Sequence, residues 1–209
     1  MEKRLKISFG ITLLLYAVGI VGLLSPYKSL FQQATPITLL VSAFLLAWNH
    51  SERTSSFYLF AIIAFAVGFG VEYLGVNHHL IFGYYQYGNT LGIKLYNIPL
   101  MIGVNWFITI YSIATVFTGR VSATRFVFAC AMTAVFLDWL MEPVAIHYDF
   151  WSWQGGQVPL SNYIGWFVVS AILFTLFNRL NVAKPNRFAL PFLIIESVFF
   201  LVLNATSRF

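Results

Sequence analysis

Ionisable side chains are scarce in this chain. Of its 209 residues, 12 are Lys or Arg and 7 are Asp or Glu, so charged residues make up 9% of the total. Soluble domains have about 25%. Hydrophobic residues account for 59% of the chain. So few charges cannot keep a water-facing surface solvated, and the composition therefore excludes a soluble globular enzyme and a disordered chain.

Cysteine is nearly absent as well. The single Cys130 cannot form an internal disulfide, which excludes a disulfide-stapled secreted domain. The formal net charge of +5 would suit a nucleic-acid partner, but the basic residues form no face or stripe. They lie between apolar segments, as in membrane proteins, and we expect no nucleic-acid binding.

Long apolar runs are what the chain has in abundance. A helix needs roughly 20 apolar residues to cross a bilayer. The sequence predicts a single all-α domain over residues 1–209, a polytopic membrane helix bundle, with the first span retained rather than cleaved as a signal peptide. The seven expected spans are Ile7–Leu24, Ala34–Trp48, Phe57–Gly75, Ile98–Phe117, Phe126–Ile146, Leu160–Phe177 and Phe188–Thr206.

Positive charge predicts the orientation of these spans. With seven spans, the side of the membrane that holds the N-terminus would carry nine of the 12 basic residues. The other side would carry only Lys28, Lys94 and Arg208. This bias places the N-terminus in the cytoplasm and the C-terminus outside, in a multi-pass protein of the cell (inner) membrane.

Most of the acidic residues lie where charge is unfavourable. Glu72, Asp138, Glu142 and Glu196 fall inside predicted spans, and Asp149 falls in an almost uncharged outer loop. An ionised carboxylate at a helix centre costs about 2.5–3.5 kcal/mol on insertion scales. We therefore expect these groups to face the bundle interior and to be paired, protonated or functional.

Three of the acids converge on one level of the bundle. At about 1.5 Å per residue, Glu72, Asp138 and Glu142 lie roughly 18–24 Å from the cytoplasmic ends of their helices, and Glu196 lies deeper at roughly 12 Å. Asp138 and Glu142 share a helix face at i,i+4 spacing. Two like carboxylates on one dry face cannot both ionise easily, so one is expected to stay protonated near pH 7. The alternative is that the acids only hydrogen-bond neighbouring helices.

Aromatic and amide residues accompany the acids. Trp139, Trp106 and Trp166 fall near the same level and would line an apolar channel or stabilise a carbocation. Asn105 and Asn162 would hold a water molecule or bond another helix. A second group clusters at the outer boundary, and for most of its members we expect an interfacial belt: Tyr84, Tyr85, Tyr87, Tyr96, Trp151 and Trp153.

The outer loops also contain His78, His79 and His147. With the acids they could build a metal site, but the sequence has no His-x-x-x-His or Glu-x-x-His pair on a helix. We therefore predict no metal. The order carboxylate, histidine, aromatics, glycine, Pro-Leu, Asn and Trp-Phe occurs twice, over Glu72–Phe107 and Glu142–Phe167. A divergent two-helix repeat or chance would explain it.

Four stretches of the sequence carry recognisable motifs: Glu72-Tyr-Leu-Gly-Val76, Phe82-Gly-Tyr-Tyr-Gln-Tyr87, Asp138-Trp-Leu-Met-Glu-Pro-Val-Ala145 and Asp149-Phe-Trp-Ser-Trp153. The most specific part is Asp-Trp-x-x-Glu-Pro followed by Asp-Phe-Trp-x-Trp. These stretches resemble the integral-membrane carotenoid hydratases, which include the γ-carotene/lycopene 1′-hydratases and the bisanhydrobacterioruberin hydratases. The similarity covers about residues 57–178.

This resemblance implies addition of water to the terminal C1′=C2′ bond of an acyclic carotenoid end, giving a tertiary alcohol without a cofactor. Asp138 or Glu142 would be the acid, the other would position water with Glu72, and Asp149 would close the mouth or serve as an alternative base. The long apolar substrate would enter from the bilayer, and other carotenoid-pathway enzymes are possible partners. Residues expected to contact the substrate are Trp139, Trp106, Trp166, Tyr73, Trp151, Trp153, His79, Asn105 and Asn162.

The same residues are also compatible with other functions. One is a metal-dependent intramembrane hydrolase or lipid-modifying enzyme that uses the histidines and carboxylates. Another is a non-catalytic carotenoid-binding protein or a proton-coupled transporter that uses the carboxylates as a relay. A carotenoid cyclase also begins with alkene protonation, but its product keeps the mass of the substrate.

Overall fold

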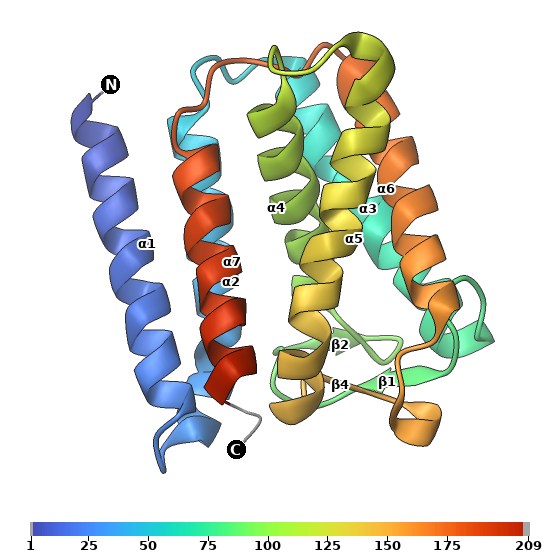
Figure 1. The fold of residues 1–209 in the computed structure, drawn as a ribbon. Helices are drawn as coiled ribbons and strands as arrows, with labels where there is room; N and C mark the ends of the chain where they lie inside the picture. The colour runs from blue at the N-terminus through green and yellow to red at the C-terminus, as the bar shows by residue number, and fades with distance from the viewer. Residues whose placement is uncertain (1, 207–209) are drawn as a thin grey trace.

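A computed structural model describes residues 2–206 as a bundle of seven long helices (Figure 1). All seven are long and apolar enough to cross a membrane, which confirms the seven predicted spans. Arg208, one of the three basic residues predicted on the outer side of the membrane, lies outside the described residues. The helices are α1 (Glu2–Leu23), α2 (Lys28–Asn49), α3 (Ser55–His78), α4 (Leu100–Phe117), α5 (Ala123–His147), α6 (Leu160–Arg179) and α7 (Ala189–Thr206).

The outer faces of the helices are apolar, as a lipid environment requires. Leu14, Val21 and Ile62 are each more than 60% exposed. Polar side chains such as Ser42 and Ser170 are instead buried between helices. The bundle therefore has the polarity of a membrane protein, with lipid-facing hydrocarbon and an interior that holds its few polar groups.

Short strands gather at one end of the bundle, which we call the hairpin end (Figure 1). Here α3 and α5 finish and α4 and α6 begin. The helical turn that ends α3 closes with His79 in the left-handed conformation, whose N–H donates to the carbonyl of Gly75. The remaining elements of this end are β1 (Tyr85–Tyr87), β2 (Lys94–Leu95), β3 (Ile98–Pro99), β4 (Trp151–Trp153) and a 3₁₀ turn, η1 (Gln154–Gly156).

The strands form two small antiparallel pairs. β2 pairs with β3 within one loop. β1 pairs with β4, and this pairing joins the loop after α3 to the loop after α5. Because α3 also packs against α4, and α5 against α6, the β1–β4 pair fixes the two helix pairs relative to each other.

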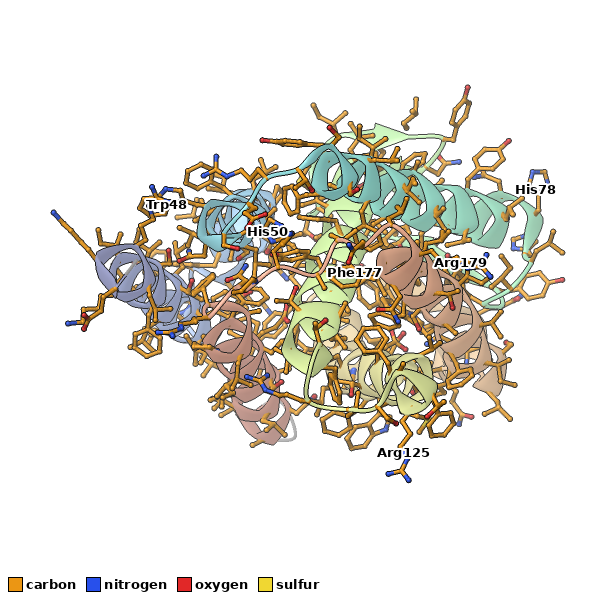
Figure 2. All side chains as sticks on the ribbon, turned by 90° about the horizontal axis from the view of Figure 1, so that it is seen from above. Trp48, His50, His78, Arg125, Phe177 and Arg179 are labelled. Carbon is orange, nitrogen blue, oxygen red and sulfur yellow. The ribbon has the colours of Figure 1, made fainter. Side chains whose placement is uncertain are left out.

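A polar node ties the helices together at the end opposite the strands. The Nδ1 atom of His50 lies 2.6 Å from the hydroxyl of Tyr111. Asn186 donates to the same hydroxyl at 2.9 Å and to the carbonyl of Leu46 at 2.9 Å. The His50 ring stacks on Phe57 with centroids 4.4 Å apart. Figure 2 shows His50 surrounded by side chains, whereas Arg125 points away from the bundle.

This node predicts a pH dependence of stability. Burial, which outweighs the opposing effect of Glu52, lowers the pKa of His50 from 6.5 to about 4, with Arg53 and Lys184 adding to the lowering. Protonation of His50 therefore favours the unfolded chain. The contribution of neutral His50 to the stability of the folded protein is complete above pH 6.5 and is lost as pH falls towards about 4. Thermal unfolding in detergent should show the midpoint falling over this window in the wild type. The fall should be smaller in His50→Gln, and parallel pH profiles would contradict the assignment.

A close approach between α3 and α4 gives a second prediction. A Cβ added at Gly68 would lie 2.3 Å from Cγ of Trp106, which is fully buried. Gly68→Ala should therefore force the indole to shift and lower stability by about 1–3 kcal/mol. Gly70→Ala is the matched control, because nothing lies within 4 Å of its Cβ position. Equal unfolding midpoints for the two variants would show that the Gly68 contact is not needed.

Candidate active site

The β1–β4 pair presents one aromatic face to the bundle interior. In this antiparallel pair Tyr85 lies opposite Trp153, and Tyr87 lies opposite Trp151. Side chains alternate along a strand, so these four residues share one face. The rings of Tyr85 and Trp153 have centroids 4.9 Å apart. We call these four side chains the aromatic roof.

The aromatic roof donates hydrogen bonds to Glu72, which is only 4% exposed. The hydroxyls of Tyr85 and Tyr87 lie 2.5 and 2.6 Å from its Oε2 atom. Nε1 of Trp106 on α4 donates to its Oε1 atom at 3.1 Å. Burial, and then the nearby Glu72, raises the pKa of both Tyr85 and Tyr87, so both phenols remain O–H donors at physiological pH.

Glu142 on α5 is bound in a parallel way. Nε1 of Trp151 and Nε1 of Trp153 donate to its Oε2 atom at 2.9 and 2.8 Å. The amide of Asn162 on α6 donates to its Oε1 atom at 3.3 Å. Both Glu72 and Glu142 thus accept three hydrogen bonds, mostly from indoles and phenols.

Asp138 lies one helical turn from Glu142 and is 1% exposed. Within residues 2–206 its side chain accepts a single hydrogen bond, from Nδ2 of Asn162 at 2.7 Å. Because Asn162 also contacts Glu142, it bridges the two carboxyl groups. Asp138 is therefore the carboxyl group of the three that has the fewest protein donors.

A cavity of about 30 Å³ lies among these groups. A buried water needs a cavity of roughly 10–15 Å³ on this measure, so the space suits one or two water molecules. The indoles of Trp106 and Trp166 stack beside it, with centroids 4.1 Å apart and planes 10° from parallel. The cavity is lined by Glu72, Phe82, Tyr85, Tyr87, Ile102, Asn105, Trp106, Asp138, Glu142, Trp151, Trp153, Asn162 and Trp166.

Glycine makes the geometry around Glu72 possible. A Cβ at Gly75 would lie 2.4 Å from the Tyr85 hydroxyl. Any larger residue there would push this phenol away from Glu72, which lies one turn earlier on α3. A Cβ at Gly165 on α6 would similarly lie 2.8 Å from the ring of Phe82.

Most residues predicted for the site meet at this cavity. Three of the four predicted catalytic acids line it, Glu72, Asp138 and Glu142. They are joined by the predicted contact residues Trp106, Trp166, Trp151, Trp153, Asn105 and Asn162. The predicted convergence of the three acids on one level is therefore confirmed.

Four predicted residues do not reach the cavity. Trp139 is 54% exposed on the lipid-facing side of α5, because a step of one residue turns it about 100° away from Asp138. Tyr73 packs edge-on against Tyr96 and His78 instead. His79 stacks on Tyr84 at the surface. Asp149 is exposed beyond the end of α5.

The sequence interpretation missed two donors. Tyr85 and Tyr87 belong to the group of six aromatics for most of which the sequence predicts an interfacial belt, but Tyr85 is 8% exposed and both hydroxyls bind Glu72. The period of two in Tyr-x-Tyr and in Trp-x-Trp is the signal that could have predicted two short strands, each with one aromatic face. Phe82 and Ile102 complete the lining and carry no comparable signal.

The histidines lie apart from the three acids. His78, His79 and His147 are all exposed. Across the part of the chain that the structure describes, no group of three or more His, Cys, Asp or Glu residues is arranged to hold a metal ion.

The family described as carotenoid biosynthesis protein matches residues 33–208. No curated protein and no solved structure matches the chain significantly. The matched range contains every residue that lines the cavity and leaves out α1. The chain is a multi-pass membrane protein with seven apolar helices within residues 2–206, and it belongs to the carotenoid biosynthesis protein family.

Proposed function

We propose that the protein is a carotenoid hydratase, which adds water to the terminal C1′=C2′ bond of an acyclic carotenoid end. The observation that supports this most is the set of three buried carboxyl groups around a cavity the size of one or two waters. Hydration of an isolated alkene needs an acid, a held water and a site that stabilises a cation. The residues of the cavity offer all three.

Asp138 is the proposed acid. Hydrogen bonds to a carboxylate favour its ionised form. Glu72 and Glu142 accept three each, whereas Asp138 accepts one, so Asp138 is the group best suited to retain a proton. Its proton passes to C2′, the π electron pair forms the new C–H bond, and a tertiary cation remains at C1′.

Water captures this cation. Glu142 and Glu72 face the same cavity, where either orients the water and accepts one of its protons as the C1′–O bond forms. The product is a tertiary alcohol. Asn162, which contacts both Asp138 and Glu142, keeps the two groups in register so that a proton can return to Asp138 between turnovers.

Aromatic faces and carboxylate charge stabilise the cation before water adds. Trp106 and Trp166 form one wall of the cavity, and the negative face of an indole attracts a cation. Preorganised charge in a site of low dielectric is the most effective means of stabilising such an intermediate. Hydration causes no net oxidation or reduction, so this reaction needs no redox cofactor.

The proposed substrate reaches the site through the membrane. A long apolar polyene dissolves in the bilayer, and the exposed apolar helix faces place the protein there. We propose the inner membrane, with the hairpin end outside as the charge bias predicts, and a place beside other enzymes that act on carotenoids.

The test is expression in cells that accumulate lycopene or γ-carotene, followed by mass analysis of the pigments. The wild type should yield pigment that has gained one water molecule for each hydrated end. Unaltered pigment in membranes that contain the folded protein would overturn the proposal. Altered pigment of unchanged mass would assign cyclisation instead.

Substitutions in the same cells test the residue roles. Asp138→Asn and Glu142→Gln should each lower the yield of hydrated pigment by about 100-fold or more, because a proton donor or acceptor is lost. Asp149→Asn is the matched control, since this acid is exposed and outside the cavity, and its yield should stay near that of the wild type. Wild-type yield from Asp138→Asn would remove Asp138 as the acid.

A further inference from the structure

A second cavity lies on the other side of α4 from most of the acid site. It measures about 90 Å³, three times the volume of the cavity at the acids, and lies between α1, α2 and α7. We call it the α1/α2/α7 pocket. Its walls are mainly hydrocarbon and aromatic, including Leu23, Phe31, Leu39, Phe150, Phe199 and Phe200.

One acidic group lines this apolar pocket. Glu196 on α7 is 5% exposed, and its Oε2 atom has no hydrogen-bond partner within the described residues. A buried carboxyl group without a partner is unfavourable in an apolar environment. The group is therefore available to a ligand that supplies a hydroxyl group.

Two residues connect the pocket with the acid site. Asn105 on α4 lines both cavities. Phe150 lines the pocket, and the next residue, Trp151, donates to Glu142. A molecule in the pocket is thus separated from the acid site by about one layer of side chains.

The pocket lies within the apolar girdle of the protein. Leu14 and Val21 of α1 and Ile37 of α2 are all more than 60% exposed, so the helices around the pocket face lipid on their outer sides. An entering molecule would come from the bilayer and would be apolar over most of its length. Space inside depends on Gly19, whose Cβ would lie 3.3 Å from the ring of Phe199.

From these observations we infer that the α1/α2/α7 pocket binds the hydroxyl-bearing end of a linear isoprenoid, with Glu196 hydrogen-bonded to the hydroxyl group. The aromatic and aliphatic walls contact this end, and the rest of the chain extends out of the pocket. This inference rests on the proposed function in one respect, since a hydrated carotenoid end belongs to this class of molecule. The pocket would then hold product, or a substrate whose other end is already hydrated, beside the acid site.

Binding of geranylgeraniol to the purified full-length protein in detergent tests the inference. The comparison probe is the hydrocarbon of the same chain without the hydroxyl group. The alcohol should raise the unfolding midpoint of the wild type more than the hydrocarbon does. Glu196→Leu should weaken alcohol binding about tenfold, as loss of a hydrogen bond to a buried acid predicts, and Glu196→Gln should largely retain it.

A matched pair of glycine variants tests the location without changing Glu196. Gly19→Leu should fill the pocket and abolish the rise in unfolding midpoint that the alcohol causes. Gly10→Leu should preserve this rise, because nothing lies within 4 Å of the Cβ position of Gly10. Equal shifts from alcohol and hydrocarbon would reduce the pocket to a general lipid site and overturn the inference. An unchanged alcohol shift in both Glu196→Leu and Gly19→Leu would also overturn it.

Asp138→Asn separates this inference from the proposed function. It should bind the alcohol as the wild type does, even though it forms no hydrated pigment. A protein that hydrates carotenoid but shows no alcohol preference would contradict only the pocket. Alcohol binding that depends on Glu196, without hydration by the wild type, would contradict only the proposed function.

Discussion

Carboxyl groups inside a lipid-facing bundle need hydrogen-bond donors from the protein, because the surrounding lipid supplies none. Glu72 and Glu142 obtain three each, and five of these six donors are indole N–H or phenol O–H groups. Aromatic donors serve two purposes here, since they satisfy the acids and also keep the cavity small. The chemistry proposed for the site depends on this arrangement of rigid donors around a space for one or two waters.

The fold follows from the need to bring those donors together. β1 and β4 lie far apart in the sequence, yet their pairing makes one roof over Glu72 and Glu142. Trp106 and Trp166, which occupy corresponding places after the two loops, stack on each other. This correspondence between the α3–α4 and α5–α6 halves is consistent with the two-helix repeat indicated by the order of motifs. Glycines at close approaches such as Gly75 allow the rings to reach the acids.

Hydropathy and helix rise were sufficient to predict seven helices and the common level of the three acids, because both depend on local sequence. Helix α2 begins at Lys28, before the predicted Ala34. Gln32 and Gln33 lower the hydropathy of its first turns, so hydropathy alone does not reveal this start. The hydrogen bonds of Tyr85 and Tyr87 to Glu72 could not be predicted, because strand pairing between distant loops decides the burial of these tyrosines. Trp139 could have been excluded, because Asp138 and Glu142 mark the inward face of α5 and Trp139 lies about 100° around the helix from Asp138. The separate pocket of Glu196 depends on how α1, α2 and α7 pack, which no local pattern reveals.

If the acid cavity delivers a proton and a water molecule to an alkene, isotopes supplied in the water must appear in the product. Membranes that contain the protein are supplied with lycopene in water enriched in heavy oxygen and deuterium. We expect one heavy oxygen and one carbon-bound deuterium in the product for each hydrated end, and neither label in pigment incubated with Asp138→Asn membranes. Pigment that gains no heavy oxygen with the wild-type protein would contradict hydration at this site.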